Sequence, residues 1–436
     1  MKKITLSLII GIVFTVSACT QANTQKDQLA VQRTISAPHN EITKATGLKS
    51  KAAIAYISNA DADAPMFVQD KSKLQAAASI CMEIILQVKL SDPVDNQSSF
   101  QTIKEALDYA QSQNYCMLNI SAEGGTYQDN LEITRPTKIS PVTRVNITIT
   151  GSISNPNGHD LNMENIVILN AQDYALFMMG NGTLILKDFI VRTTRRNPNN
   201  IKSGTAIELH DGVQGHFNNV NMENNDGVAL YINGANTKVI AYNFNVFDNR
   251  IHPLAIKQNI NDKSLSRFAA VDVAFGATLL VDGFCIYNNE MTGVLARETG
   301  NVLLNNGYVA GTKDYEAEQG NTIGGNNIMT AFQGIAEMNN FESRYAKSCG
   351  LFATDSYLKV QNGDIHHNPV GTCVFGNPSD TYDITKCVTN NTTHYHDNLS
   401  NIEAPSVAIP DENCSLPDPP PSCNQQPNCP GVTWVE

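Results

Sequence analysis

The stretch that decides the fold is GVALYINGANTKVIAYNFNVFDN at 227–249. It opens on Gly, continues as an alternating apolar strand, turns, and runs into a second alternating strand that ends in Asn. Two other stretches repeat this order, GVLARETGNVLLNNGYVAGT at 293–312 and GLFATDSYLKVQNGDIHHN at 350–368. Self-similarity at a short period is the sequence signature of a solenoid. We therefore expect one elongated core built from stacked turns.

The repeat length suits a turn of three short strands and three bends. Gly204 and Gly227 lie 23 residues apart, and Asn225 and Asn249 lie 24 apart. Successive turns of parallel strands are spaced by about 4.8 Å, so equivalent side chains stack on one another. We expect the residues after the opening Gly to point inward, which are Val228, Val294 and Leu351.

Asparagine is unusually common, with 49 residues in a chain of 436. Asn tolerates the left-handed backbone conformation of a bend, and its amide can bond the Asn one turn away. Asn225, Asn249 and Asn289 are predicted to form such a ladder. The alternative interpretation, a row of Asn that binds sugar, is less favoured.

Composition excludes several classes of protein. The charged fraction is 17 %, and Asn and the 28 Gly are poor helix formers, which excludes a coiled coil or helical bundle. The formal net charge of −12 argues against a nucleic-acid partner, because such a protein needs a basic face.

The N-terminus has the features of an export signal. An apolar run at 4–16 is too short to cross a bilayer as a helix. It ends in VSAC at 16–19, which resembles the lipobox of bacterial lipoproteins. Residues 1–18 are then a signal peptide, and Cys19 carries the lipid that attaches the protein to the membrane. An ordinary signal-peptidase site is the alternative.

By resemblance to Gram-negative sorting signals, Thr20 after the lipidated Cys favours the outer membrane over the inner one. Residues 19–72 are polar and without an apolar period, so we expect a flexible tether. The β-helix domain is predicted at 73–403. The tail at 404–436 holds eight Pro and three Cys, and is predicted to be a disulfide-clipped strap anchored by Trp434.

Cysteine usage agrees with export, because disulfides are expected outside the cytoplasm. Nine Cys remain if Cys19 is lipidated, so at least one thiol is left free or pairs with another chain. Cys285, in the apolar run FCIY, is predicted to be the buried free thiol.

The entrance to the repeats has its own pattern. ICMEIILQVKL at 80–90 reads as a strand buried on both faces. SSFQTIKEALDYAQSQ at 98–113 reads as a helix capped by Ser99. We expect this helix to close the open apolar end of the solenoid.

The run FQTIKEALDYAQ, followed by a strand and GGTYQDNLEI, resembles the entrance of the pectin lyase-like group of proteins. The resemblance implies an all-β fold, a single-stranded right-handed parallel β-helix solenoid with an N-terminal capping helix. It implies little about activity, because one fold hosts many functions.

A candidate catalytic row follows the Asn ladder. Asp226, Arg250 and Glu290 each follow a laddered Asn, so they are predicted to lie on one face of adjacent turns. Pectate lyases of this fold use an Arg as base and carboxylates to hold Ca²⁺, so the resemblance implies a catalytic role and a Ca²⁺ cofactor. The favoured interpretation is a surface ion ladder, because the motifs of pectate lyases, polygalacturonases and pectin methylesterases are absent.

Histidines gather late in the chain. Alternation places His394 and His396 on one face of a strand, and His366 one turn below could complete a transition-metal site. Surface imidazoles are the alternative.

Two functional hypotheses follow. The first is a lipid-anchored β-helix of the cell envelope that binds polysaccharide or a protein without catalysis. The second is a carbohydrate-active enzyme, a uronate polysaccharide lyase or a glycoside hydrolase. The acidic charge favours the first, because a polyanionic uronate would need Ca²⁺ to bridge it to the protein.

Overall fold

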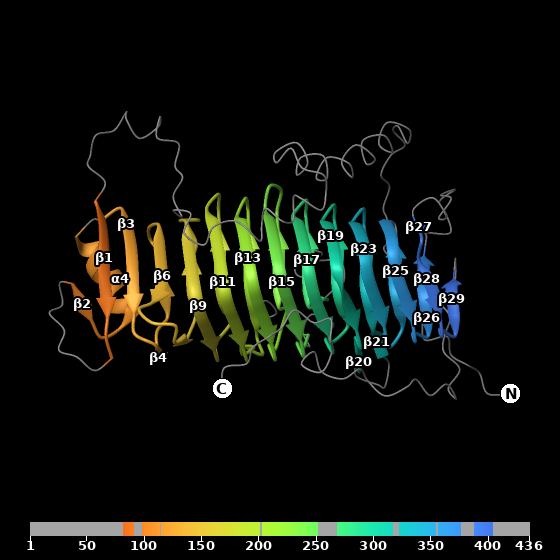
Figure 1. Ribbon diagram of the computed structural model, residues 1–436, viewed down its shortest axis with the longest axis horizontal. Helices are drawn as coiled ribbons and strands as arrows, with labels where there is room; N and C mark the ends of the chain where they lie inside the picture. The colour runs from red at the N-terminus through yellow and green to blue at the C-terminus, as the bar shows by residue number, and fades with distance from the viewer. Residues whose placement is uncertain are drawn as a thin grey trace, which may run out of the picture. The chain divides into compact units, whose positions relative to one another are not determined.

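The computed structural model describes residues 82–90, 98–113, 115–200, 203–251, 268–316, 322–354, 356–375 and 388–403. In these residues two long parallel sheets coil around one apolar core (Figure 1). The predicted signal peptide, Cys19, the tether and the C-terminal tail lie outside the described residues. No helix in the described ranges is long and apolar enough to span a membrane.

The larger sheet, sheet A, has 16 strands, and those of its main path follow one another along the solenoid in nearly the order of the chain. Its path contains β2 (Ser99–Phe100), β1 (Glu83–Val88), β3 (Met117–Ala122), β6 (Thr137–Pro141), β9 (Leu161–Leu169), β11 (Thr183–Arg192), β13 (Gln214–Glu223), β15 (Lys238–Phe247), β17 (Thr278–Tyr287), β19 (Asn301–Ala310), β23 (Ile335–Arg344), β25 (Tyr357–His366) and β27 (Val388–Asn391). The strands β4 (Gly125–Tyr127), β7 (Ile147–Thr150) and β28 (His394–His396) pair beside this path.

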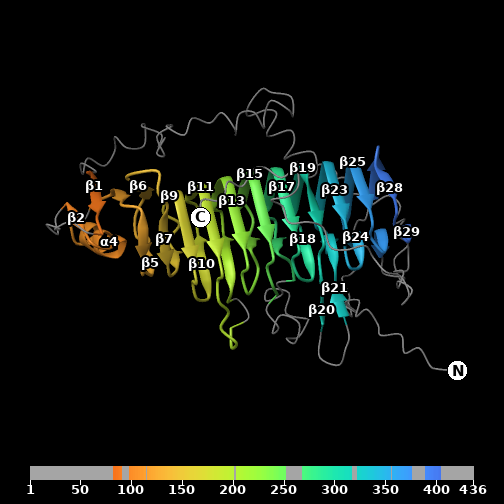
Figure 2. The ribbon, with the colours of Figure 1, turned by 60° about the horizontal axis from the view of Figure 1, so that its bottom comes forward.

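The second sheet, sheet B, has 11 strands and lies on another side of the core (Figure 2). In chain order they are β5 (Leu131–Glu132), β8 (Ile153–Asn155), β10 (Tyr174–Met179), β12 (Thr205–His210), β14 (Leu230–Asn233), β16 (Val271–Ala274), β18 (Thr292–Arg297), β22 (Asn326–Ala331), β24 (Cys349–Thr354), β26 (Val370–Phe375) and β29 (Ser400–Glu403). Each strand pairs in parallel with the equivalent strand one turn away, as between Leu230 and Val271.

Sheet A makes two walls because its long strands bend in the middle. The ten-residue strand β15 bends at Asn243, which has a φ of 52°, and β17 bends at Gly283, with a φ of 73°. Asn and Gly enter this left-handed region at little cost. The two halves of sheet A and the single wall of sheet B therefore supply the three predicted walls. The chain is a single-stranded right-handed parallel β-helix, as predicted.

The inward positions are apolar, although one was assigned to the wrong row. Val294 and Leu351 are buried in the main core. The residue stacked with them through Val271 is Leu230 and not Val228. Val228 is buried, but it lies two residues before β14 begins and does not belong to the main core.

The helix α4 (Ile103–Ser112) closes the N-terminal end of the core, as predicted, but it begins later. Its N-cap is Thr102, whose side chain accepts from the Glu105 N–H while the Glu105 carboxylate accepts from the Thr102 N–H. This capping box is a strong start signal. Ser99, the predicted cap, lies instead in β2. The helix buries Ile103, Ala106, Leu107 and Ala110.

The first strand is also different from the prediction. In β1, Leu86 and Val88 are buried, but Ile85 is 65 % exposed. The strand is therefore buried on one face only.

Two stretches, 258–268 and 313–330, make their turns of the solenoid longer than the others, as in the 40 residues between Asn249 and Asn289. Most of 258–268 lies outside the described residues. In 313–330 the chain forms an antiparallel pair, β20 (Asp314–Glu316) and β21 (Thr322–Gly324), before β22 returns to sheet B. The pair stands apart from both parallel sheets (Figure 2).

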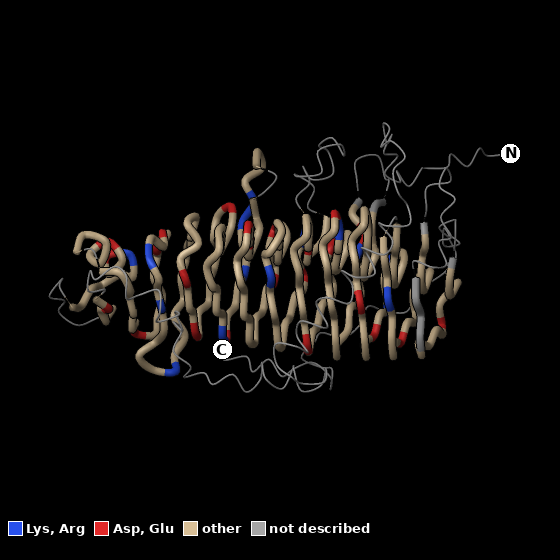
Figure 3. Tube along the Cα trace, turned by 90° about the horizontal axis from the view of Figure 1, so that it is seen from above, with Lys and Arg blue, Asp and Glu red and all other residues tan. Residues whose placement is uncertain are grey.

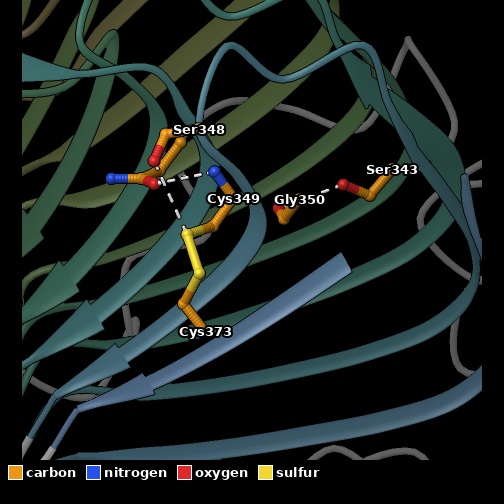
Figure 4. The surroundings of a disulfide bond; sticks show 6 residues. Ser343, Ser348, Cys349, Gly350 and Cys373 are labelled. Carbon is orange, nitrogen blue, oxygen red and sulfur yellow. Dashed lines mark hydrogen bonds between the residues drawn. A yellow bond between two sulfur atoms is a disulfide. The ribbon is translucent and has the colours of Figure 1, made fainter. Parts of the chain in front are cut away.

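A disulfide joins Cys349 in β24 to Cys373 in β26, one turn later (Figure 4). The Cys349 N–H also donates to Asn326 Oδ1 at 3.2 Å. Cys285 is fully buried, but it is disulfide-bonded, as is Cys116. The prediction of a free thiol at Cys285 is therefore wrong. Its apolar neighbours in β17 indicated burial but carried no information on pairing.

Candidate functional site

The predicted charge row occupies one bend of consecutive turns. The Arg250 N–H donates to the Asn225 carbonyl at 2.9 Å, and the Glu290 N–H donates to the Asn249 carbonyl at 3.0 Å. Asp226, Arg250 and Glu290 therefore succeed one another turn by turn. The row continues to Arg195 before Asp226 and to Lys313 after Glu290, so the sign of the charge alternates through five turns.

The side chains of this row do not converge on a reaction centre. The Asp226 carboxylate lies 3.6 Å from Arg195, and the Glu290 carboxylate accepts from the Ile251 N–H at 2.9 Å. Among the described residues, Arg250 lies within 4.0 Å of neither carboxylate. The row is therefore a succession of alternating charges in which, within the described part of the chain, Arg195 and Asp226 form an ion pair and Arg250 and Glu290 do not.

The predicted Ca²⁺ ligands of this row are poorly placed for one ion. Asp226 and Glu290 belong to turns two steps apart, or roughly 10 Å along the solenoid. Oxygen ligands of Ca²⁺ lie within about 2.6 Å of the ion. These two carboxylates therefore do not make a shared Ca²⁺ site. Acidic and basic residues are interspersed along the solenoid (Figure 3).

A denser polar cluster lies on the outer face of sheet B. Inward side chains of these strands are apolar, and the alternate positions point outward. Glu208, Tyr231 and Asp272 are register neighbours in β12, β14 and β16. Two residues after Glu208 and Tyr231 in their strands, His210 is the register neighbour of Asn233. Two residues after Asp272, Ala274 is the register neighbour of Arg297 in β18. We call Glu208, His210, Tyr231, Asp272 and Arg297 the sheet B cluster.

Arg297 and Asp272 form a buried ion pair across adjacent turns. Arg297 Nε donates to Asp272 Oδ1 at 3.0 Å, and Arg297 Nη2 donates to Oδ2 at 3.3 Å. The guanidinium also lies 5.4 Å above the Phe275 ring. Burial lowers the pKa of Arg297 and is the largest single effect, but the charge and hydrogen bonds of Asp272, together with Tyr231 and Glu298, outweigh it, so that the pKa is raised. The cluster therefore keeps a fixed cation on the wall.

His210 is held from both sides. One ring nitrogen, Nε2, lies 2.7 Å from Glu208 Oε1, and the other, Nδ1, lies 3.2 Å from Asn233 Nδ2. Because Asn233 donates to Nδ1, the neutral ring carries its proton on Nε2, toward Glu208. The ring then packs edge-on against Tyr231, with centroids 5.5 Å apart. The His210 ring, held at both nitrogens, therefore lies against Tyr231 in the adjacent strand.

Sequence reasoning missed this cluster, although a signal was present. The signal is a set of polar or ionisable residues at outward positions of otherwise apolar strands. These residues are Glu208, His210, Tyr231, Asp272 and Arg297. Their alignment depends on the register of four turns separated by bends of unequal length. That register was not available from spacing alone.

The C-terminal histidines are brought together in part. His366 in β25 pairs in register with His396 in β28, and Asp364 pairs with His394. In the part of the chain that the structure describes, one group of His, Cys, Asp and Glu could share a metal ion, and it contains Asp364, His366 and His396. Asp364 therefore takes the place predicted for His394.

Comparison with known proteins gives the fold only. No family model matches the chain, and no curated protein matches it by sequence. Among solved structures it is similar to a pectate lyase, with 11 % identity, a TM-score of 0.42, and coverage of 74 % of this chain and 79 % of the other. It is also similar to the A-module of a mannuronan C-5 epimerase from Azotobacter vinelandii, with 11 % identity, a TM-score of 0.35, and coverage of 73 % and 96 %. A periplasmic alginate epimerase matches with 11 % identity, a TM-score of 0.27, and coverage of 67 % and 77 %.

Proposed function

We propose that this protein is an enzyme that acts on a uronate polysaccharide, with the sheet B cluster as its site. The observation that carries the proposal is the Arg297 guanidinium, which is bound by Asp272, the register neighbour of Tyr231, and which interacts electrostatically with Tyr231. A fixed cation beside an ionisable phenol is what proton abstraction next to a carboxylate requires. The long parallel wall suits an extended polymer.

In the proposed reaction the uronate carboxylate approaches Arg297, which stabilises the negative charge that develops when the C5 proton leaves. Tyr231, as the phenolate, takes that proton, so the C5–H bond breaks. The C4–O4 bond then breaks, C4=C5 forms, and the departing O4 takes the proton back from Tyr231. Glu208 and His210 fix the ring of Tyr231. Reprotonation of C5 by water on the opposite face, before O4 leaves, would give epimerisation instead.

A second candidate, binding without catalysis, is favoured by one observation. Tyr231, Asp272 and Arg297 are at most 3 % exposed in this structure. A polymer bound along the neighbouring charge row would not need to reach them. That row offers Arg195, Arg250 and Lys313 as cations for an acidic glycan or an acidic protein.

The experiment is to incubate the protein with polygalacturonate and with alginate, with and without Ca²⁺, and to follow the ultraviolet absorbance of the C4=C5 bond. Tyr231→Phe should lower the rate by at least about 100-fold. Tyr242→Phe, the same change in β15, is the matched control and should retain the rate. Binding without a new double bond in any polymer would support the second candidate instead.

The proposal includes the cellular address. We propose that the protein is exported and held at the outer membrane of a Gram-negative cell by lipid on Cys19, so that the solenoid meets polysaccharide of the envelope. The VSAC sequence at 16–19 and Thr20 support this address.

A further inference from the structure

The last turns of the solenoid bring two imidazole rings and a carboxylate onto one outward face. His366 and His396 stack in parallel, with ring centroids 4.6 Å apart and planes at 9°. One ligand atom of each, together with a carboxylate oxygen of Asp364, lies within 4.8 Å of the others. The three residues come from β25 and β28, which are paired strands of sheet A.

One ring nitrogen of each histidine lies within hydrogen-bonding distance of a carboxylate outside this group of three residues. His366 Nε2 lies 2.8 Å from Glu342 Oε1, and His396 Nδ1 lies 2.8 Å from Asp397 Oδ2. Histidines that bind metals almost always donate their other ring N–H to a carboxylate or carbonyl, which fixes the tautomer. In neutral rings, this pattern leaves Nδ1 of His366 and Nε2 of His396 as the nitrogens that can bind an ion.

Each of these two nitrogens lies close to another atom that could bind the same metal ion. His396 Nε2 lies 3.0 Å from Asp364 Oδ1, a buried oxygen that makes no hydrogen bond of acceptable geometry. His366 Nδ1 lies 2.5 Å from Nδ1 of the adjacent His367. Ligand atoms around one Zn²⁺ ion stand roughly 3.3 Å apart, given metal–ligand bonds of about 2.0 Å. Small side-chain rotations would therefore bring these ligand atoms to the spacing that a bound ion requires.

The local charge favours a divalent cation. Glu342, Asp364 and Asp397 are acidic, and Arg344, which lies 2.8 Å from Glu342, is the basic residue in contact with them. With neutral imidazoles the group carries about two net negative charges. Two imidazoles and a carboxylate form a ligand set that suits Zn²⁺, Cu²⁺ and Ni²⁺. Ca²⁺, in contrast, prefers sites made of oxygen ligands alone.

We propose that Asp364, His366 and His396 bind a divalent transition-metal ion, with His367 as a further ligand and with Glu342 and Asp397 orienting the imidazoles. The ion would fasten β28, a three-residue strand in the last turn, to β25. This site is separate from the sheet B cluster and does not rest on the proposed function. Ligands from two paired strands make the bound ion a cross-link of the folded state.

The test uses the untagged full chain, stripped of metal with a chelator and titrated with Zn²⁺ by calorimetry, followed by thermal unfolding with and without Zn²⁺. We expect one equivalent of Zn²⁺ to bind and to raise the unfolding temperature by several degrees, because a ligand that binds only the folded state stabilises it. His366→Ala and His396→Ala should each weaken binding at least about tenfold. His216→Ala, in β13 several turns away, should bind as the wild type does.

Asp364→Asn tests the carboxylate without changing its size, and should weaken Zn²⁺ binding while the protein without metal unfolds at nearly the same temperature. Absence of stoichiometric Zn²⁺ and Cu²⁺ binding to the folded wild type would overturn the proposal. So would binding that survives unchanged in a folded His366→Ala, His396→Ala double variant.

Discussion

Asn225 donates both its backbone N–H and its side-chain amide to Oδ1 of Asn249, at 3.1 and 2.8 Å, although the two residues are 24 positions apart. Asn249 makes the same two contacts to Asn289, each at 3.0 Å. All three residues are at most 1 % exposed. The predicted ladder is therefore a buried polar stack that satisfies backbone groups at a bend. This confirms its structural role and gives a reason for the high Asn content.

Replacing the central member of the ladder should destabilise the solenoid. Asn249→Leu removes the acceptor of Asn225 and the side-chain donor to Asn289, and each buried polar group left unpaired costs about 1–3 kcal/mol. We expect the free energy of unfolding, measured by urea denaturation, to fall by at least that amount. Asn199→Ala, at an exposed turn, is the control and should change it by less than about 0.5 kcal/mol. Equal stability of the two variants would contradict the role of the ladder.

The fold could be predicted because its decisive signals are local and repeated. Three local signals each specify one feature of the stack. They are the apolar alternation in 227–249, the Asn at the bends and the helix before the first full turn. The register between strands of neighbouring turns was harder to predict. Opening Gly residues suggested that Val228 aligns with Val294, whereas the backbone pairs Leu230 with that row. Strand pairing is set by all the bends of a turn together, and these differ in length.

The candidate site could not be predicted to the same extent. Asp226, Arg250 and Glu290 were correctly placed in adjacent turns, because each follows a laddered Asn. Their side-chain partners were not, since Asp226 pairs with Arg195 from the turn before. Asp272 and Arg297 are 25 residues apart and carry no motif. Their contact appears only when strands β16 and β18 are aligned.

The ion pair of the sheet B cluster gives a second stability prediction. Arg297→Met leaves Asp272 charged in a buried position, and removing one partner of such a pair costs about 3–5 kcal/mol. The double variant Asp272→Leu, Arg297→Met removes both charges and should recover most of that loss, as measured by denaturant unfolding. A double variant as unstable as the sum of the singles would show that the two residues do not interact.

The address makes a prediction that is independent of the fold. If Cys19 carries lipid, Cys19→Ala should transfer the protein from the detergent phase to the aqueous phase in a phase-separation assay of whole cells. Cys285→Ala serves as a comparison, because this Cys lies in the solenoid wall and its loss should leave the protein in the detergent phase. A Cys19→Ala protein that stays with the membrane would contradict lipid attachment at this residue.

The most direct test of the proposed function is to follow the C5 proton of a uronate polymer by nuclear magnetic resonance in D₂O. Both elimination and epimerisation remove this proton, whereas binding or glycoside hydrolysis leaves it in place. We predict that the wild-type protein depletes the C5 proton signal and that Arg297→Lys, with its charge kept but its fork-shaped contact to Asp272 lost, does so at least about 100-fold more slowly. An unchanged C5 proton signal with a polymer that the wild type binds, or equal depletion by Arg297→Lys, would contradict it.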